Sequence, residues 1–227
     1  MNPINWLYYR YIFLRENPIA RAIASMAKKP PVPSQEVWES QYRSGHWARL
    51  NNLTEVGHNS VVFSYITHLR PQGSILEIGC GEGILLRKLK KVGYSRYVGI
   101  DMSAFAIEKC REFADEKTSF VVGDAESHSY DSRFDFVVLN EAIYYFVEPI
   151  KTLEHYVRYL APGGLFVISI FDKPRTRAIR RRLKACFPVL DETRITNAGG
   201  SWYCLVLAPK TTAVSEDALE DKTAGLV

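Results

Sequence analysis

A short glycine-rich segment and two acidic residues carry the first chemical signal in this 227-residue sequence. The segment at residues 77–83, Glu-Ile-Gly-Cys-Gly-Glu-Gly, directly follows an apolar run. Its glycines let the backbone bend sharply and let a ligand approach without an intervening Cβ atom. Asp101 and Asp124 each follow a further apolar run, and carboxylates at such strand ends suit a ribose or the edge of an adenine. Together these residues predict a nucleotide-type binding site.

The spacing of the glycines separates two kinds of nucleotide site. A dinucleotide-binding loop usually has its third glycine at the position that Ile84 occupies here, whereas this loop has Gly79, Gly81 and Gly83. The spacing therefore argues against a pyrophosphate ligand and against a nicotinamide-dependent oxidoreductase. Both features also have a purely structural explanation, since a glycine loop can simply reverse the chain and an Asp at a strand end can simply cap the following helix.

The elements that must position these residues alternate between strands and helices. Apolar runs predict strands at residues 74–78, 97–100, 119–122, 134–139 and 165–171. Helical patterns occupy residues 84–92, 104–114, 150–160 and 173–184, and residues 189–196 and 202–207 flank a turn as an antiparallel hairpin. Since strands joined by crossover helices pair in parallel, the predicted fold class is α/β. We expect a Rossmann-like, doubly wound, mostly parallel seven-stranded sheet with an antiparallel terminal hairpin and helices on both faces.

Composition divides the chain into three parts. Residues 1–33 form an aromatic and basic helical segment with a Pro-rich linker, residues 34–210 form the globular domain, and residues 211–227 form a small, polar, acidic tail that we expect to be disordered. With 47% hydrophobic and 24% charged residues, the chain has the composition of an ordinary globular protein. Its cysteines show no zinc-like spacing, so we expect reduced thiols and no metal. The apolar run at residues 4–14 is interrupted by Arg10 and lacks a cleavage site, so we expect a cytoplasmic location, with peripheral membrane contact as an alternative.

Five motifs, in order and at the expected spacing, resemble those of class I S-adenosylmethionine-dependent methyltransferases. They are ILEIGCGEG (75–83), YVGIDMS (97–103), VVGDAES (121–127), FDFVVLNEAIYYF (134–146) and LAPGGLFVIS (160–169). The resemblance covers residues 38–209 and includes the terminal hairpin. It implies S-adenosyl-L-methionine as the cofactor and S-adenosyl-L-homocysteine as the product. The segment EAIYY (141–145) is locally similar to small-molecule methyltransferases that include nodulation-factor N-methylating enzymes, which mildly favours a small or sugar-like acceptor.

The resemblance also implies where the methionine portion of the cofactor would bind. Gly79 and Gly81 would approach it through their backbone, and Glu77 would hold the loop or the methionyl amine. Asn140, at the end of the fourth strand, would lie beside the sulfonium and its methyl group.

For the adenosine portion, the resemblance implies contacts from two strand ends. Asp101 would take the ribose hydroxyls and Met102 would flank the adenine. Asp124 would meet the adenine amino group, with Ala125 beside it through its backbone.

The segment after the fourth strand should border the site of methyl transfer. Glu141 is the best candidate for a base or for a carboxylate that orients the acceptor, and Tyr144 and Tyr145 are candidates for the pocket wall. In the alternative interpretation, Glu141 caps the following turn and the tyrosines pack in the core. An oxygen acceptor would need a base to take its proton, whereas a neutral amine would need little beyond desolvation.

An upstream aromatic segment is the candidate cover for the cofactor. Tyr42, Trp47 and His58 are its predicted lid residues, and His58 is also a second, weaker candidate base. Trp38, by contrast, is expected to serve in packing and not as a lid residue, because aromatic stripes more often pack.

Two basic segments lie outside these motifs. Residues 4–28 interleave aromatic and basic side chains and suit either peripheral membrane contact or packing on the domain or a second subunit. The basic helix at 173–184 suits an anionic acceptor or a phospholipid headgroup, although a solvent-exposed face is the simpler explanation. Nucleic acid is not expected as a partner, because no second basic stripe accompanies this helix. The sequence thus predicts methyl transfer to an oxygen or nitrogen atom of a small-molecule acceptor, sugar-like or lipid-linked. The alternative is a non-catalytic cofactor-binding scaffold that recruits partners through the basic and aromatic segments. The sequence does not determine the oligomeric state.

Overall fold

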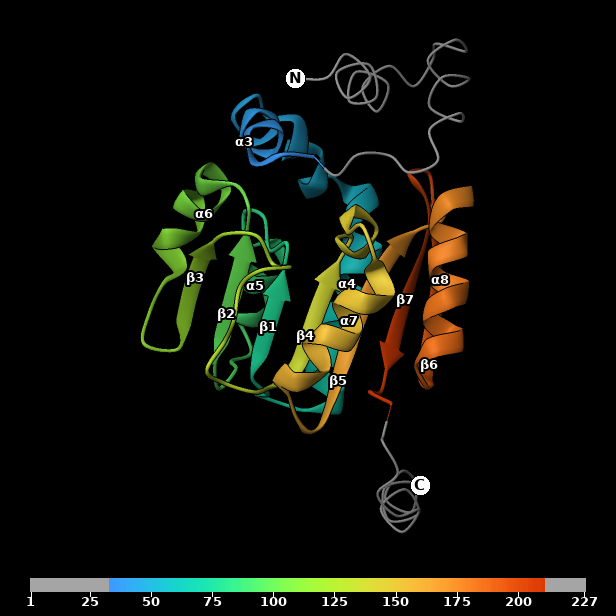
Figure 1. Ribbon diagram of the computed structural model, residues 1–227. Helices are drawn as coiled ribbons and strands as arrows, with labels where there is room; N and C mark the ends of the chain where they lie inside the picture. Colours follow the sequence, from blue (N-terminus) through green and yellow to red (C-terminus); the bar gives the residue numbers. More distant parts are fainter. Residues whose placement is uncertain (1–32, 211–227) are drawn as a thin grey trace.

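The computed structural model describes residues 33–210 (Figure 1). The predicted helices and membrane contact at residues 4–28 and the predicted disordered tail at 211–227 lie outside the described residues and stay predictions. Within 33–210, no helix has the length and apolar character needed to cross a bilayer. The same part of the chain contains no cluster of side chains suited to a metal, and its four cysteines are unpaired.

A seven-stranded sheet in the order β3-β2-β1-β4-β5-β7-β6 forms the centre of the domain. Its strands are β1 (Ile75–Ile78), β2 (Tyr97–Asp101), β3 (Thr118–Val122), β4 (Phe134–Asn140), β5 (Leu160–Phe171), β6 (Val189–Asn197) and β7 (Gly200–Leu207). Strands β1 to β5 pair in parallel, while β7 pairs antiparallel with both β5 and β6. The predicted sheet with its antiparallel terminal hairpin is therefore confirmed.

Helices cover both faces of this sheet, as the nearly continuous apolar character of the strands requires. One core joins the sheet to α7 (Pro149–Tyr156) and α8 (Pro174–Cys186), through side chains such as Leu153 and Leu183. The opposite core joins it to α4 (Leu53–Leu69) and α5 (Ile84–Leu89), through Val62 and Leu86. Alternate residues of β4 enter the two cores, with Val137 in the first and Val138 in the second.

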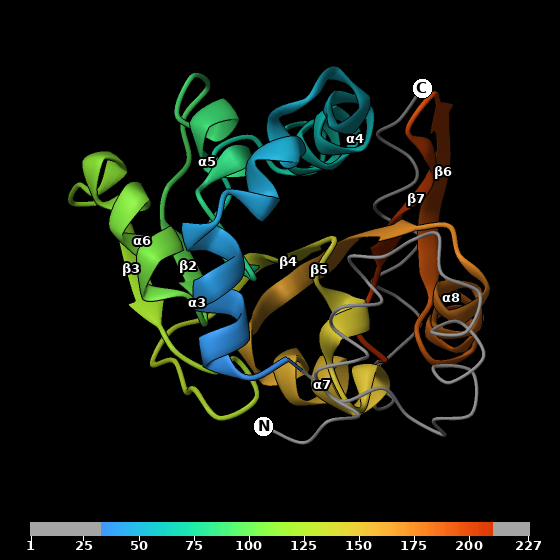
Figure 2. The ribbon, with the colours of Figure 1, turned by 90° about the horizontal axis from the view of Figure 1, so that it is seen from above.

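The segment before α4 lies across the carboxyl ends of the strands. It comprises α3 (Gln35–Arg43) and the short 3-10 helix η1 (His46–Asn51). In Figure 1, α3 lies above the arrowheads of β1 and β2, and the view from above in Figure 2 places it over the same end of the sheet. This segment thus covers the edge at which ligands bind in open α/β sheets.

The structure departs from the predicted bounds at the ends of two helices and at the start of one strand. The helix expected at 84–92 ends at Leu89, and α6 (Ala104–Cys110) gives way to a 3-10 turn at Arg111–Phe113. Ser103 caps α6, because its hydroxyl accepts a hydrogen bond from the Ala106 amide. Strand β5 begins at Leu160, earlier than the predicted residue 165, so the Pro162-Gly163-Gly164 turn lies within it.

Candidate active site

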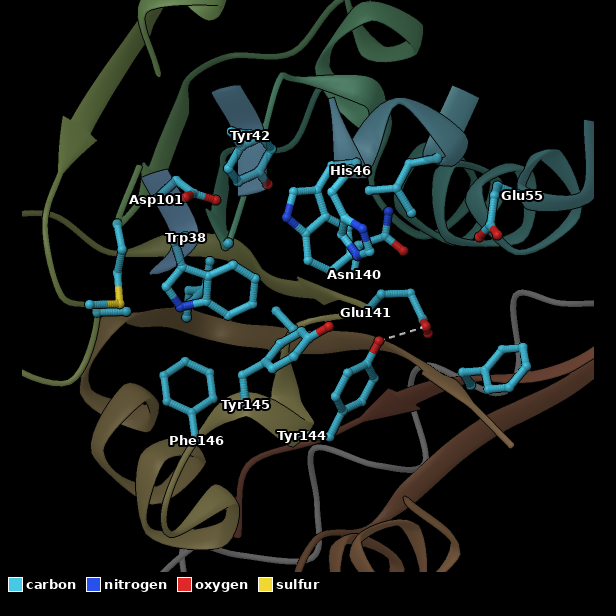
Figure 3. A pocket seen from close by; sticks show the side chains of 18 of the residues that line it. Trp38, Tyr42, His46, Glu55, Asp101, Asn140, Glu141, Tyr144, Tyr145 and Phe146 are labelled. Carbon is cyan, nitrogen blue, oxygen red and sulfur yellow. Dashed lines mark hydrogen bonds between the residues drawn. The ribbon is translucent and has the colours of Figure 1, made fainter. Parts of the chain in front are cut away.

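A cavity of about 680 Å³ opens at the carboxyl ends of the strands, beneath α3 and η1 (Figure 3). The cofactor side, as we name it, contains Gly79, Asp101, Met102, Gly123, Asp124 and Ala125. The acceptor side contains Glu55, Glu141, Tyr144, Phe171, Lys173 and Trp202. Asn140, Ala142 and Tyr145 line the same cavity. Residues distant in sequence therefore converge on one space of the size that holds small ligands.

Asp101 fixes the glycine loop to the end of β2. Its Oδ2 accepts a 2.9 Å hydrogen bond from the Gly81 amide, and its Oδ1 accepts one of 2.9 Å from the Ser103 amide. The side chain is only 9% exposed, and burial raises the pKa of its carboxyl to about 6 despite these donors. Asp101 thus shapes the loop and also lines the cavity.

The three predicted methionine-side residues of the glycine loop occupy different positions. Gly79 lines the cavity, and its φ of 70° belongs to the left-handed region that glycine favours. Gly81 is covered by Tyr42 from α3. Glu77 lies behind the wall, where the Tyr97 hydroxyl donates to its carboxyl group, and burial raises its pKa to about 8. Glu77 therefore supports the loop from below and has no place on the cavity wall.

The predicted adenine-side residues lie together on the cavity wall. Asp124 is exposed and accepts a 2.9 Å hydrogen bond at Oδ1 from the Glu126 amide. The carbonyl of Ala125 accepts a 2.6 Å hydrogen bond from the Tyr156 hydroxyl, which anchors this loop to α7. Met102 completes the group from the end of β2.

Aromatic rings close the cavity from above, and they correct one prediction. Trp38 lines the cavity and is not a core residue. Its ring stacks on that of Trp47 with ring centroids 5.6 Å apart, and it forms a T-shaped contact with the ring of Tyr145, whose centroid is 4.7 Å away. The ring centroids of Tyr42 and Trp47 are 6.1 Å apart. Its position on a helix above the strand ends, rather than against the sheet, explains why Trp38 stays partly exposed.

Helix α3 is tied to the domain by Glu39. The Glu39 Oε2 atom accepts hydrogen bonds from the Ser103 hydroxyl at 2.8 Å and from the Phe105 amide at 3.1 Å, at the start of α6. An ion pair to Arg43 occupies the other oxygen at 2.7 Å. These contacts hold the cover over the cofactor side.

A chain of hydrogen bonds fixes the side chain of Asn140. Its Nδ2 donates to Asn59 Oδ1 at 2.7 Å, and its Oδ1 accepts from the Ser169 hydroxyl at 2.7 Å. Asn59 in turn donates to the Glu55 carbonyl at 2.8 Å. The orientation of Asn140 on the cavity wall is therefore set by α4 and β5.

Glu141 faces the acceptor side from a strained backbone position. Its φ is 60°, which is unusual for a residue with a side chain. The Tyr144 hydroxyl donates to its Oε2 at 2.9 Å, a contact drawn in Figure 3. Desolvation raises the pKa of the Glu141 carboxyl to about 7, although the bonds from Tyr144 and Ser169 oppose that rise. A carboxyl with such a pKa can exchange a proton near neutral pH.

His58 does not line the cavity. The side chain is 2% exposed, and its ring stacks on Trp202 with ring centroids 5.1 Å apart. Desolvation lowers its pKa to about 4, so the imidazole is neutral at pH 7. The geometry thus gives His58 neither a lid contact nor access to an acceptor.

Sequence reasoning missed Glu55, which lies one helical turn before His58 and does line the cavity. A glutamate in the first turn of a helix usually indicates only favourable helix electrostatics. The further missed wall residues include His46, Arg49 and Trp202, whereas Lys173 belongs to the basic segment at 173–184 that the sequence singles out.

The comparisons with known proteins show the family of the chain. A family model described as a methyltransferase domain matches residues 16–221. Demethylmenaquinone methyltransferase of Clavibacter sepedonicus is 30% identical over 190 residues, which cover 79% of this chain and 76% of that protein. Malonyl-[acyl-carrier protein] O-methyltransferase 2 of Ilyobacter polytropus is 31% identical over 52% of this chain. The chain spans about half the length of that relative, 47%.

Solved structures share the fold. The N-methyltransferase NodS of Bradyrhizobium japonicum, crystallised with S-adenosyl-L-homocysteine, superposes with a TM-score of 0.63 at 21% identity, covering 73% of this chain and 92% of NodS. Magnesium protoporphyrin IX methyltransferase of Synechocystis, with bound S-adenosylmethionine, gives a TM-score of 0.62 at 17% identity, covering 81% of this chain and all of that one, 100%. With a family model matched over most of its length and this sheet order, the chain belongs to the methyltransferase domain family and has its class I, Rossmann-like fold.

Proposed function

We propose that this protein transfers the methyl group of S-adenosylmethionine to a nucleophilic atom of a small molecule bound on the acceptor side of the cavity. The observation that carries the proposal is the continuity of that cavity. It joins the loop of Gly79 and Asp101 directly to Glu141 and Tyr144. A donor and an acceptor can therefore meet within one continuous cavity.

The residues present fit the proposed cofactor. The Gly79 backbone lines the cavity, and its φ of 70° and the Ala142 Cβ, 3.0 Å from the Cβ position, both favour glycine there, which leaves the backbone open to a ligand. Asp101 is oriented by two backbone amides and presents its carboxylate to the cavity, as ribose binding requires. We assign the adenine to the wall of Met102, Asp124 and Ala125.

When bound, this cofactor supplies an electrophilic methyl group on a sulfonium. The protein's task is then to hold the acceptor in line and exclude water, a proximity effect that contributes up to about 7–11 kcal/mol. The fixed Asn140 amide forms the wall between the two sides, and the rings of Trp38 and Tyr145 close it from above. Aromatic faces also stabilise a neighbouring cation.

Glu141 is the proposed proton acceptor. It lies on the acceptor side, its carboxyl has a pKa of about 7, and Tyr144 holds one of its oxygens. Such a group takes a proton from the incoming nucleophile at neutral pH. Tyr144 is the proposed positioning residue, while Tyr145 belongs to the aromatic cover.

A labelling experiment tests this proposal. Purified protein is incubated with S-adenosylmethionine labelled in its methyl group and with a fractionated extract of its source cells, and labelled products are identified by mass spectrometry. We expect a small molecule to gain one methyl group. Binding of the cofactor without any labelled product across all fractions would instead support the non-catalytic scaffold.

A further inference from the structure

Two carboxyl groups from distant parts of the chain face the acceptor side. Glu55 belongs to the first turn of α4, and Glu141 follows β4. Both line the same cavity, and in Figure 3 both side chains lie at the end of the cavity away from Asp101. Each carboxyl raises the energy of ionising the other, as the influence of Glu55 on the pKa of Glu141 shows.

Glu55 is buried without a hydrogen-bond donor for its carboxylate among residues 33–210. Only 9% of the surface of this residue is exposed. Its nearest basic atoms are Arg49 Nη1 and His58 Nδ1, each 3.8 Å away and beyond hydrogen-bond distance. Since His58 is neutral at pH 7, it provides no balancing charge. Burial raises the pKa of Glu55, and Arg49, an exposed side chain that forms a long ion pair with it, opposes this rise, but no group in this part of the chain donates a hydrogen bond to the carboxylate. A ligand that supplies donors and a positive charge would therefore stabilise it further.

The two basic side chains on this side of the cavity act on the carboxyl groups from a distance, Arg49 on Glu55 and Lys173 on Glu141, and each also contacts an aromatic ring. The Arg49 guanidinium lies 5.0 Å from the centroid of the Trp47 ring. The Lys173 ammonium lies 4.8 Å from that of Phe171. Both residues are exposed at the rim, whereas Glu55 is buried and Glu141 partly buried. The inner part of the acceptor side is therefore acidic, and a cation fits it better than an anion.

We propose that the acceptor is an amine, which docks as an ammonium against Glu55 and Glu141 and receives the methyl group on its nitrogen. This inference rests on the proposed function and narrows its acceptor to one chemical class. The ammonium first gives one proton to the Glu141 carboxylate. The freed lone pair then forms the N–C bond as the C–S bond breaks, and its electrons pass to sulfur. The products are an N-methylammonium and a neutral thioether, so charge and atoms balance.

Three probes of similar shape test the charge preference. Phenethylamine, 2-phenylethanol and 3-phenylpropionate are titrated into protein saturated with S-adenosyl-L-homocysteine, and binding is followed by NMR. We expect the amine to bind about tenfold more tightly than the alcohol, because charge-assisted hydrogen bonds to buried carboxylates are strong. Glu55→Gln should remove most of that preference. Glu154→Gln, on the exposed side of α7, should leave it unchanged.

The outcomes separate this inference from the proposed function. If S-adenosyl-L-homocysteine itself fails to bind, the proposed function is wrong. If it binds but the amine binds no better than the alcohol, or the carboxylate binds best, only the amine inference is wrong. In the labelling experiment, a methyl group on a basic nitrogen supports the inference, and a methyl group on oxygen, carbon or sulfur contradicts it.

Discussion

The Tyr42 hydroxyl lies 2.8 Å from the point that a Cβ atom on Gly81 would occupy. Tyr42 is 8% exposed and is held within α3, so it cannot easily yield. Through this contact, the helix that covers the cavity rests directly on the glycine loop. The loop and its cover are therefore one unit, and a change in the loop must disturb both.

Gly81→Ala should weaken binding of S-adenosyl-L-homocysteine about tenfold or more, as measured by calorimetry. The added methyl group would displace Tyr42, and the φ of 54° disfavours any side chain there. Gly45→Ala is the matched control. Gly45 has a φ of 72° but nothing within 4 Å of its Cβ position. The Gly45→Ala variant should lose about 1 kcal/mol of stability and keep its affinity for S-adenosyl-L-homocysteine. An equal loss of affinity in both variants would contradict the assigned role of Tyr42.

Glu39→Ala should speed the release of S-adenosyl-L-homocysteine about tenfold, because it removes both hydrogen bonds that tie α3 to the start of α6. Stopped-flow fluorescence measures this rate through Trp38 and Trp47, which line the cavity. The control is Glu36→Ala, an exposed glutamate on the same helix. An unchanged rate in Glu39→Ala would show that α3 does not retain the ligand.

The sequence predicts the strands of this protein better than its site. Strands such as β4 are buried on both faces, so their apolar runs are local and nearly continuous. The glycine loop and Asp101 are equally local, because each follows a strand directly. Helix ends are less well defined, since the change from α to 3-10 geometry at Arg111 depends on packing.

The part of the acceptor side that α4 contributes could not be predicted, because it depends on how α4 packs against the sheet, whereas Glu141 and Tyr144 follow β4 directly in the sequence. Glu55 and His58 lie on one helix, three residues apart, yet Glu55 faces the cavity and His58 stacks on Trp202 of β7. Only the contact between α4 and β7 decides which of them reaches a ligand. Trp38 was likewise misassigned, because the sequence does not show that α3 lies over the strand ends.

The rate of methyl transfer should rise with pH through about 7 and then level off. Glu141 must lose its proton before it can accept another, and its pKa is about 7. Glu141→Gln should lower kcat roughly 10²–10⁴-fold and abolish this rise. Tyr144→Phe should move the rise to higher pH, because the bond from Tyr144 lowers the pKa of Glu141. A profile that is unchanged in Glu141→Gln would exclude this carboxyl as the base.

Stability of the unliganded protein should fall as pH rises from about 5 to 8. Burial raises the pKa values of Glu77 to about 8, Glu141 to about 7 and Asp101 to about 6, all above those of the unfolded chain. The native state therefore binds more protons in this window, and each excess proton lowers the free energy of unfolding by about 1.4 kcal/mol per pH unit.

Urea denaturation at pH 5.5 and 8 measures this dependence. Glu77→Gln should reduce the slope between the two pH values, since it removes the carboxyl with the highest pKa of the three. Glu154→Gln, an exposed control, should retain the wild-type slope. A stability that increases over this range would contradict the burial of these acids in the protonated form.

The central claim is that the cavity beside Gly79 and Asp101 binds an adenosyl sulfonium. Calorimetric titration of the protein and of Asp101→Ala with S-adenosyl-L-homocysteine tests it most directly. Asp101 orients the glycine loop through Gly81 and also lines the cavity, so its loss should weaken binding at least tenfold. Saturable binding by the parent protein and its marked loss in Asp101→Ala are the predicted result. No binding by the folded parent protein, or equal affinity in the two proteins, would contradict the account.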